Sequence, residues 1–139
     1  QRDILITPDE DTWRVWNYKG TPEEIIAELK QRFGCPIVAI TIREVQTVWR
    51  NRWSSMAISD KIYKSKRIYD VEIVDRLGAG DSFTAGFLYG YLTGDVQKGI
   101  DFGDAMAAFK HSFPGDSNYM TYEEIETATK AAGDLRVKR

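Results

Sequence analysis

The first 41 positions of the chain contain two short apolar runs, with a segment of helical periodicity between them. Residues 4–7 form a short apolar run that ends at a proline, which is typical of a buried strand. Between positions 22 and 33 apolar residues recur at helical spacing, after a capping box of Thr21 and Glu24. Residues 36–41 are again nearly all apolar, as in a parallel strand that is buried on both faces. The order of strand, helix and strand predicts a βαβ unit with a right-handed crossover.

The segment from residue 47 to residue 74 has a different pattern, in which short apolar stretches alternate with polar turns. This pattern predicts an antiparallel edge built from short strands at 47–49, 55–58, 61–63 and 71–74. Helical patterns are predicted at 11–18, 82–92, about 96–112 and from Thr121 to Ala132, where Thr121 and Glu124 form a second capping box. The patterns together predict an α/β fold in one domain, residues 1–139.

Composition narrows the classes of function. With 42% hydrophobic and 29% charged residues the chain is ordinary for a soluble globular protein. A net charge of −2 provides no basic field, so nucleic acid is not an expected partner, and no apolar run reaches the length of a membrane span. The single cysteine, Cys35, suits a cytoplasmic protein without disulfides. Because His111 is the only histidine, neither a histidine metal cluster nor a Ser-His-Asp triad is expected.

The stretch Asp-Arg-Leu-Gly-Ala-Gly-Asp-Ser-Phe at 75–83 lies between a predicted strand and a predicted helix. Glycines there allow the backbone to approach a phosphate closely, and the free N–H groups at a helix start favour an anion. The carboxylate of Asp81 would repel that anion unless it acts as a base that takes a proton from a hydroxyl group. The alternative is that Asp81 only stabilises the helix dipole and the glycines only permit the turn. Spacing alone does not separate the two interpretations.

Residues 75–87 resemble the Asp-Thr-x-Gly-Ala-Gly-Asp signature region of the ribokinase-like (PfkB-type) carbohydrate kinases. Residues 38–41 are similar to the strand that ends in a nucleotide-contacting threonine in this family. Residues 41–45, the Asp75-Arg76 pair and the segment 107–116 resemble the 2-keto-3-deoxygluconate kinases in particular. The resemblance implies a three-layer α/β/α, Rossmann-like fold with a largely parallel sheet and an antiparallel edge. It also implies transfer of the γ-phosphoryl group of ATP to the terminal hydroxyl of a small sugar acid.

The resemblance also implies a role for each matching residue. Asp81 would be the general base and would meet the substrate hydroxyl, beside an anion hole formed by the backbone of Gly78, Ala79 and Gly80. ATP would bind with Mg²⁺. The remaining implied contacts are Thr41, Arg43, Gly78, Gly80 and Asn118 for the nucleotide, Arg76 for the substrate and Asp75 for a monovalent cation such as K⁺. Simpler interpretations are a strand-end position for Thr41, a capping carboxylate for Asp75 and a solvent-exposed Arg76.

The chain also departs from the family pattern. The sugar-binding half and the β-sheet lid that precede this segment in the family have no counterpart here, so a C-terminal, nucleotide-binding part is expected. The initial Gln instead of Met fits a fragment or a processed product. The alternative function is that of a nucleotide-binding or assembly fragment without turnover. Its expected partner is a missing N-terminal half or a second copy, with tryptophans as candidates for core packing or for that interface: Trp13, Trp16, Trp49 and Trp53.

Two substitutions affect the expected phosphate and metal contacts. The family tends to carry an Asn-x-x-Glu motif where this chain has Pro-Asp-Glu-Asp at 8–11, so the asparagine is absent and Asp11 has a shorter reach than glutamate. Arg43 stands where a glycine is often found two residues beyond the strand-end threonine. We therefore expect the position of Mg²⁺ and the path of the triphosphate to differ from the family pattern.

Overall fold

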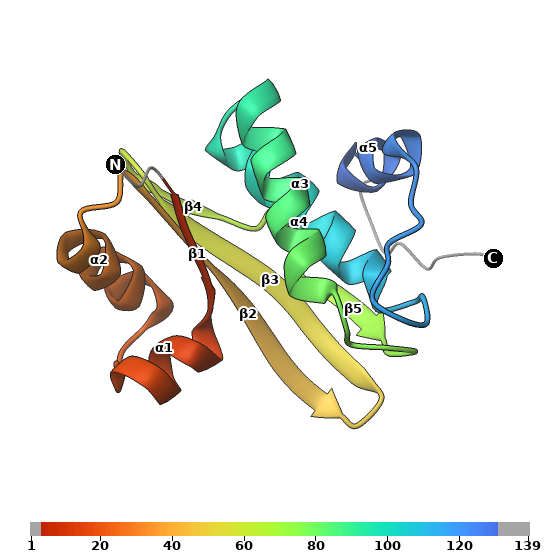
Figure 1. Cartoon of the computed structure of the whole chain (residues 1–139), viewed down its shortest axis with the longest axis horizontal. Helices are drawn as coiled ribbons and strands as arrows, with labels where there is room; N and C mark the ends of the chain where they lie inside the picture. The colour runs from red at the N-terminus through yellow and green to blue at the C-terminus, as the bar shows by residue number, and fades with distance from the viewer. Residues whose placement is uncertain (1–3, 131–139) are drawn as a thin grey trace.

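A βαβ unit and a long β-hairpin form the N-terminal part of the chain, and three helices follow (Figure 1). The structure is a computed structural model that describes residues 4–130, apart from the side chains of Trp13, Val15 and Trp16. Its elements are β1 (Ile4–Pro8), α1 (Asp9–Trp16), α2 (Pro22–Phe33), β2 (Ile37–Thr47), β3 (Arg50–Ile58), β4 (Ile62–Lys64), β5 (Tyr69–Glu72), α3 (Ala79–Thr93), α4 (Val96–Lys110) and α5 (Tyr122–Lys130).

The sheet has the strand order β1-β2-β3-β4, and β5 pairs with the first half of β3. β1 and β2 are parallel, which confirms the βαβ unit, with Pro8 level with Thr41. The other three pairs among the described strands are antiparallel. The sheet therefore contains more antiparallel pairing than the expected largely parallel arrangement. The reason is that β3 pairs with both β4 and β5 on the side away from β2.

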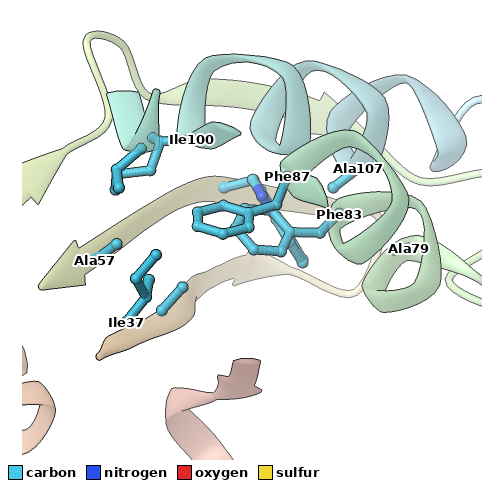
Figure 2. Packing of buried hydrophobic residues seen from close by; sticks show 10 residues of the cluster. Ile37, Ala57, Ala79, Phe83, Phe87, Ile100 and Ala107 are labelled. Carbon is cyan, nitrogen blue, oxygen red and sulfur yellow. The ribbon is translucent and has the colours of Figure 1, made fainter. Parts of the chain in front are cut away.

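Two helical layers enclose the sheet because residues along β2 point alternately to its two faces. Val38 and Ile40 pack with Ile26 and Leu29 of α2 on one face. Ile37 and Ala39 point to the opposite face, toward a cluster that includes Phe83, Phe87 and Ile100 from α3 and α4 (Figure 2). Figure 1 shows α1 and α2 on one side of the sheet and α3, α4 and α5 on the other. This arrangement is the expected three-layer α/β/α fold.

Both capping boxes are present as predicted. The side chain of Thr21 accepts the N–H of Glu24, whose carboxylate accepts the N–H of Thr21, and Gly34 ends α2 in the left-handed region at φ 62°. The reciprocal bonds between Thr121 and Glu124 open α5 in the same way. The part of the last predicted helix beyond Lys130 lies outside the described residues.

The predicted strand at 47–49 is wrong. β2 continues to Thr47, and the following two residues form the turn that joins it to β3. The apolar side chains of Val48 and Trp49 suggested a strand, but they are exposed at the tip of the hairpin. Trp53, four residues further on, is buried in the core instead. Trp53 therefore takes part in core packing, which is one of the two roles expected of the tryptophans. The other role, an interface with another chain, remains a prediction.

Helices α3 and α4 are antiparallel and lie unusually close together. A Cβ atom on Gly86 would come within 2.7 Å of the carbonyl oxygen of Phe102, and one on Gly90 within 2.4 Å of that of Lys98. Both glycines therefore allow backbone-to-backbone contact between the two helices. Within residues 4–130, none of the helices combines the length and apolarity needed to cross a membrane.

Candidate active site

A cavity of about 370 Å³ opens at the edge of the sheet where β1 ends and α3 begins. Ligands of open α/β sheets bind at the carboxyl ends of the parallel strands, and this cavity has that position. Its wall is contributed by the end of β1, the first turn of α1, the middle of β2 and β3, the start of α3 and the end of α4. The polar side chains and turn residues that matter below are Asp9, Glu10, Thr41, Arg43, Arg76, Ala79, Gly80, Asp81 and His111.

The glycine turn adopts a conformation that only glycine accommodates at its first position. Gly78 is the N-cap of α3 with φ 78°, in the left-handed region. A Cβ atom on Gly78 would lie 2.1 Å from the backbone carbonyl oxygen of Asp116. Gly78 is thus held from behind by the loop after α4, whereas Ala79 and Gly80 line the cavity itself.

The start of α3 presents unpaired backbone donors. The first bond of the helix runs from the N–H of Ser82 to the carbonyl of Gly78, and the N–H of Ala79 reaches the carbonyl of Arg76 at 3.4 Å. The N–H groups of Gly80 and Asp81 have no hydrogen-bond partner within residues 4–130. These are the orphan donors of a helix N-terminus, and the helix dipole adds a positive field there. The turn can therefore receive an anion such as a phosphoryl oxygen.

Asp81 has the exposure that a base requires. Its side chain is exposed, lines the cavity and forms no hydrogen bond or ion pair with any residue of the described chain. A carboxylate that only capped the helix dipole would need no cavity in front of it. The arrangement is compatible with proton abstraction from a hydroxyl group held beside the turn.

Arg43 and Thr41 also line the cavity, and both belong to β2. Thr41 is buried, while the half-buried Arg43 donates from Nη2 to Oε1 of Glu10 at 2.5 Å. The neighbouring Asp9 accepts the N–H of Glu10 at 2.8 Å, and burial raises the pKa of this carboxyl above its usual range. An acidic pair thus faces the cationic side chain that was predicted to contact the nucleotide.

Asp75 and Arg76 lead into the turn and are both tied to other loops. The carboxylate of Asp75 accepts the N–H of Leu77 at 3.0 Å and that of Gly115 at 2.9 Å, and these two bonds lower its pKa. Arg76 is exposed and lines the cavity, while its Nη2 donates to the carbonyl of Val48 at 2.8 Å. Of this pair only Arg76 reaches the cavity.

Asn118 does not line the cavity. Its side-chain nitrogen donates to the carbonyl of Met106 at 3.0 Å and to Oγ of Ser82 at 3.3 Å, and its oxygen accepts the N–H of Met120. The side chain therefore joins α4 to α3 near the start of α3. Its predicted contact with the nucleotide is not tested by this geometry and stays a prediction.

The sequence assigned no role at the site to several residues of the cavity. Asp9 and Glu10 directly follow β1, so the rule that parallel strands end at one edge could have placed them beside Thr41. Asp11, which was considered as a metal ligand, is exposed and does not line the cavity. Trp53 had no sequence signal beyond its hydrophobicity.

His111 and Trp53 form the floor of the cavity together. Their rings meet edge to face with centroids 5.5 Å apart. The imidazole Nδ1 lies 2.7 Å from the carbonyl of Ala107, so Nδ1 carries the proton and donates it. Burial lowers the pKa of His111, which is therefore neutral at pH 7. The indole of Trp53 donates to the buried carboxyl of Asp104 at 3.2 Å, and burial raises the pKa of Asp104 to about 7.

Comparisons with known proteins fit this geometry. Residues 3–134 match the sequence model described as pfkB family carbohydrate kinase. The chain is 26% identical over 138 residues to a 2-dehydro-3-deoxygalactonokinase of Haloferax volcanii, covering 99% of this chain and 41% of that protein.

Solved structures give the same result. A 2-dehydro-3-deoxygluconokinase of Thermotoga maritima superposes with a TM-score of 0.84 at 35% identity, over 93% of this chain and 41% of that one. A putative 2-keto-3-deoxygluconate kinase of Enterococcus faecalis has the same fold, with a TM-score of 0.74 at 22% identity, over 90% of this chain and 39% of that one. The chain thus spans about two fifths of the length of these relatives.

Proposed function

This chain belongs to the pfkB family of carbohydrate kinases, and from that premise we propose that it carries the phosphate-binding turn and the catalytic base of an ATP-dependent sugar kinase. The proposed substrate is a small sugar acid of the 2-keto-3-deoxygluconate class. The similarity to two kinases of keto-deoxy sugar acids supports this substrate class.

One observation carries the proposal. The exposed carboxylate of Asp81 and the unpaired N–H groups of Gly80 and Asp81 belong to residues that line one cavity, in the first turn of a 15-residue helix. A base and an anion-binding cradle on adjacent residues are what transfer of a phosphoryl group to an alcohol requires.

The proposed chemistry uses these two features together. The substrate hydroxyl donates its proton to a carboxylate oxygen of Asp81 as its oxygen attacks the γ-phosphorus of ATP. The bond between that phosphorus and the bridging oxygen breaks, and ADP leaves with the bridging oxygen. The N–H groups at the start of α3 bind the oxygens of the phosphoryl group during transfer, where negative charge must be stabilised. Arg76 and Arg43, which both line the cavity, supply positive charge.

The acidic residues of the cavity fit a magnesium ion that is held mainly by ATP. Mg²⁺ usually takes one or two carboxylates together with phosphates and water. Asp9 lines the cavity and could provide such a ligand, whereas Glu10 is paired with Arg43 and Asp81 is assigned to the base. No group of three or more His, Cys, Asp or Glu side chains that could hold a metal by themselves occurs in the described part of the chain. Bound Mg²⁺ would neutralise charge on the phosphates.

A second candidate is nucleotide binding without turnover by these 139 residues alone. It is favoured by the coverage of only 41% of the relatives and by the sheet, in which β1 pairs with β2 alone among the described strands. The sugar-binding half would then have to come from a further segment or another chain.

The test combines calorimetry of Mg·ATP binding with an assay of phosphoryl transfer to 2-keto-3-deoxygluconate. Transfer is measured with the chain alone and after addition of the N-terminal part of a related kinase. Asp81→Asn should keep ATP binding and abolish transfer, whereas the exposed control Asp11→Asn should retain both. ATP binding without transfer in every combination would support the second candidate, and no ATP binding at all would contradict both.

A further inference from the structure

Lys110, the last residue of α4, is a fully buried lysine that the proposed reaction does not use. Its side chain is 0% exposed, and Nζ donates to the carbonyl of Phe113 at 3.0 Å. Within residues 4–130 no carboxylate lies within 4.0 Å of this ammonium group. Burial of an ammonium group without a paired carboxylate is costly, so the charge needs a compensating environment.

Two sources of negative potential surround the ammonium group. The carbonyl groups at the end of α4 form the negative pole of the helix. Asp75 provides a carboxylate whose pKa is lowered first by the N–H groups of Leu77 and Gly115, and further by the charge of Lys110. Lys110 thus neutralises charge at the point where the end of α4 meets the entry to the glycine turn.

The loop folded by Lys110 is also the loop that supports Gly78. Residue 113 bonds to Lys110, residue 115 donates to Asp75, and the carbonyl of Asp116 lies against the α-carbon of Gly78. The N–H groups of Val74 and Asp75 both donate to the carbonyl of His111, which closes the connection. The ammonium group, the loop at 111–116 and the turn therefore form one braced unit.

The residues around Asp75 do not fit the monovalent cation that was expected there. Both oxygens of Asp75 already accept backbone N–H groups, and the carbonyl of Phe113, an oxygen of the type that K⁺ requires, already accepts a bond from Nζ of Lys110. We propose that the ammonium group of Lys110 is a built-in cation that replaces a free monovalent ion beside the glycine turn. Lys110 is a positioning residue, and its link to phosphate binding rests on the proposed function.

The experiment measures thermal unfolding of the 139-residue chain without nucleotide, in potassium chloride and in choline chloride at equal ionic strength. The unaltered chain should unfold at the same temperature in both salts. Lys110→Ala should unfold at a lower temperature and regain stability in potassium or ethylammonium chloride, because either cation can enter the vacated space. Lys110→Met should respond to neither cation, since its side chain fills that space, and the exposed control Lys19→Ala should behave as the unaltered chain.

Two results would overturn the proposal. One is stabilisation of the unaltered chain by potassium over choline by about 3 °C or more, which would reveal a site for the free ion. The other is a Lys110→Ala chain that neither potassium nor ethylammonium stabilises or refolds. In the same salts, calorimetry should show Mg·ATP binding about tenfold weaker for Lys110→Ala, with recovery in ethylammonium chloride. If the unaltered chain binds no ATP in any salt, the proposed function fails, while the unfolding data still decide the role of Lys110.

Discussion

The carbonyl oxygen of Asp116 lies 2.1 Å from the position that a Cβ atom would take on Gly78. Gly78→Ala should therefore add a steric clash with backbone to the cost of a left-handed alanine. We expect the free energy of unfolding in urea to fall by about 2 kcal/mol or more, since the conformational cost alone is about 1 kcal/mol.

Gly34→Ala provides the matched control for that variant. Gly34 also has a positive φ, 62°, but a Cβ atom there would meet nothing within 4 Å. Its cost should be conformational only, about 1 kcal/mol. Equal losses of stability in the two variants would show that the loop gives way and does not support the turn.

Gly80→Ala should separate binding from stability. Gly80 is helical and lines the cavity, and a Cβ atom there would meet no other atom within 4 Å. The helix should become as stable or more stable, by up to about 1 kcal/mol. The methyl group would nevertheless stand beside the free N–H groups, so Mg·ATP binding measured by calorimetry should weaken about tenfold or more. Unchanged affinity would mean that phosphate does not approach the turn closely.

Asp104 should make the stability of the protein depend on pH between about 4 and 7. Its pKa, about 7 in the folded chain, is above the ordinary value of 3.8, so the folded state binds a proton that the unfolded state releases. The stabilisation from this proton is complete below pH 4, is lost as the pH rises toward 7, and changes no further above 7. The free energy of unfolding should thus fall by about 3 kcal/mol from pH 5 to pH 8.

The Asp104→Asn variant tests this assignment by urea unfolding at each pH. The hydroxyl of Ser65 has one proton but two acceptors, the carbonyl of Ser55 at 2.9 Å and the carboxyl of Asp104 at 2.5 Å. A protonated Asp104 supplies the missing hydrogen, and an asparagine amide can supply it as well. The variant should fold and lose the dependence on pH. The same slope in both proteins would show that another group titrates.

Arg43 should affect binding more than stability. Its ion pair with Glu10 is partly exposed, so Arg43→Met should change the free energy of unfolding by no more than about 1 kcal/mol. If the guanidinium group contacts a phosphate, calorimetry should show Mg·ATP binding about tenfold weaker. Lys19→Met removes one positive charge from an exposed position and should leave the affinity unchanged. A parallel loss in both variants would indicate only an effect of net charge.

Local signals made much of the fold predictable. The capping box at Thr21, the glycine after α2 and the apolar run of β2 each specify an element through neighbouring residues. The hairpin of β2 and β3 was predicted less well, because the exposed Val48 and Trp49 have the composition of a strand although they form its turn. The hydrophobicity of a side chain predicts its burial poorly where a strand extends beyond the helices that cover the sheet.

Only the part of the candidate site that lies within a local sequence motif could be predicted from the sequence. The glycine turn and Asp81 were found because their spacing is local in the sequence. Asp9 and His111 reach the same cavity from α1 and from the end of α4, and their positions depend on strand register and helix packing. The buried carboxyl of Asp104 had no signal at all, because an aspartate on a helix usually faces solvent.

The close packing of α3 and α4 at their glycines has a mechanical consequence. The backbones of the two helices are in close contact at Gly86 and Gly90, so that sliding of one helix along the other would disturb this packing. Asp81, the proposed base, lies in the first turn of α3, and Lys110 is the last residue of α4, so the two residues belong to one closely packed pair of helices. A motion that opens or closes the cavity would have to move Asp81 and Lys110 together, with hinges in the loops on either side of the two helices.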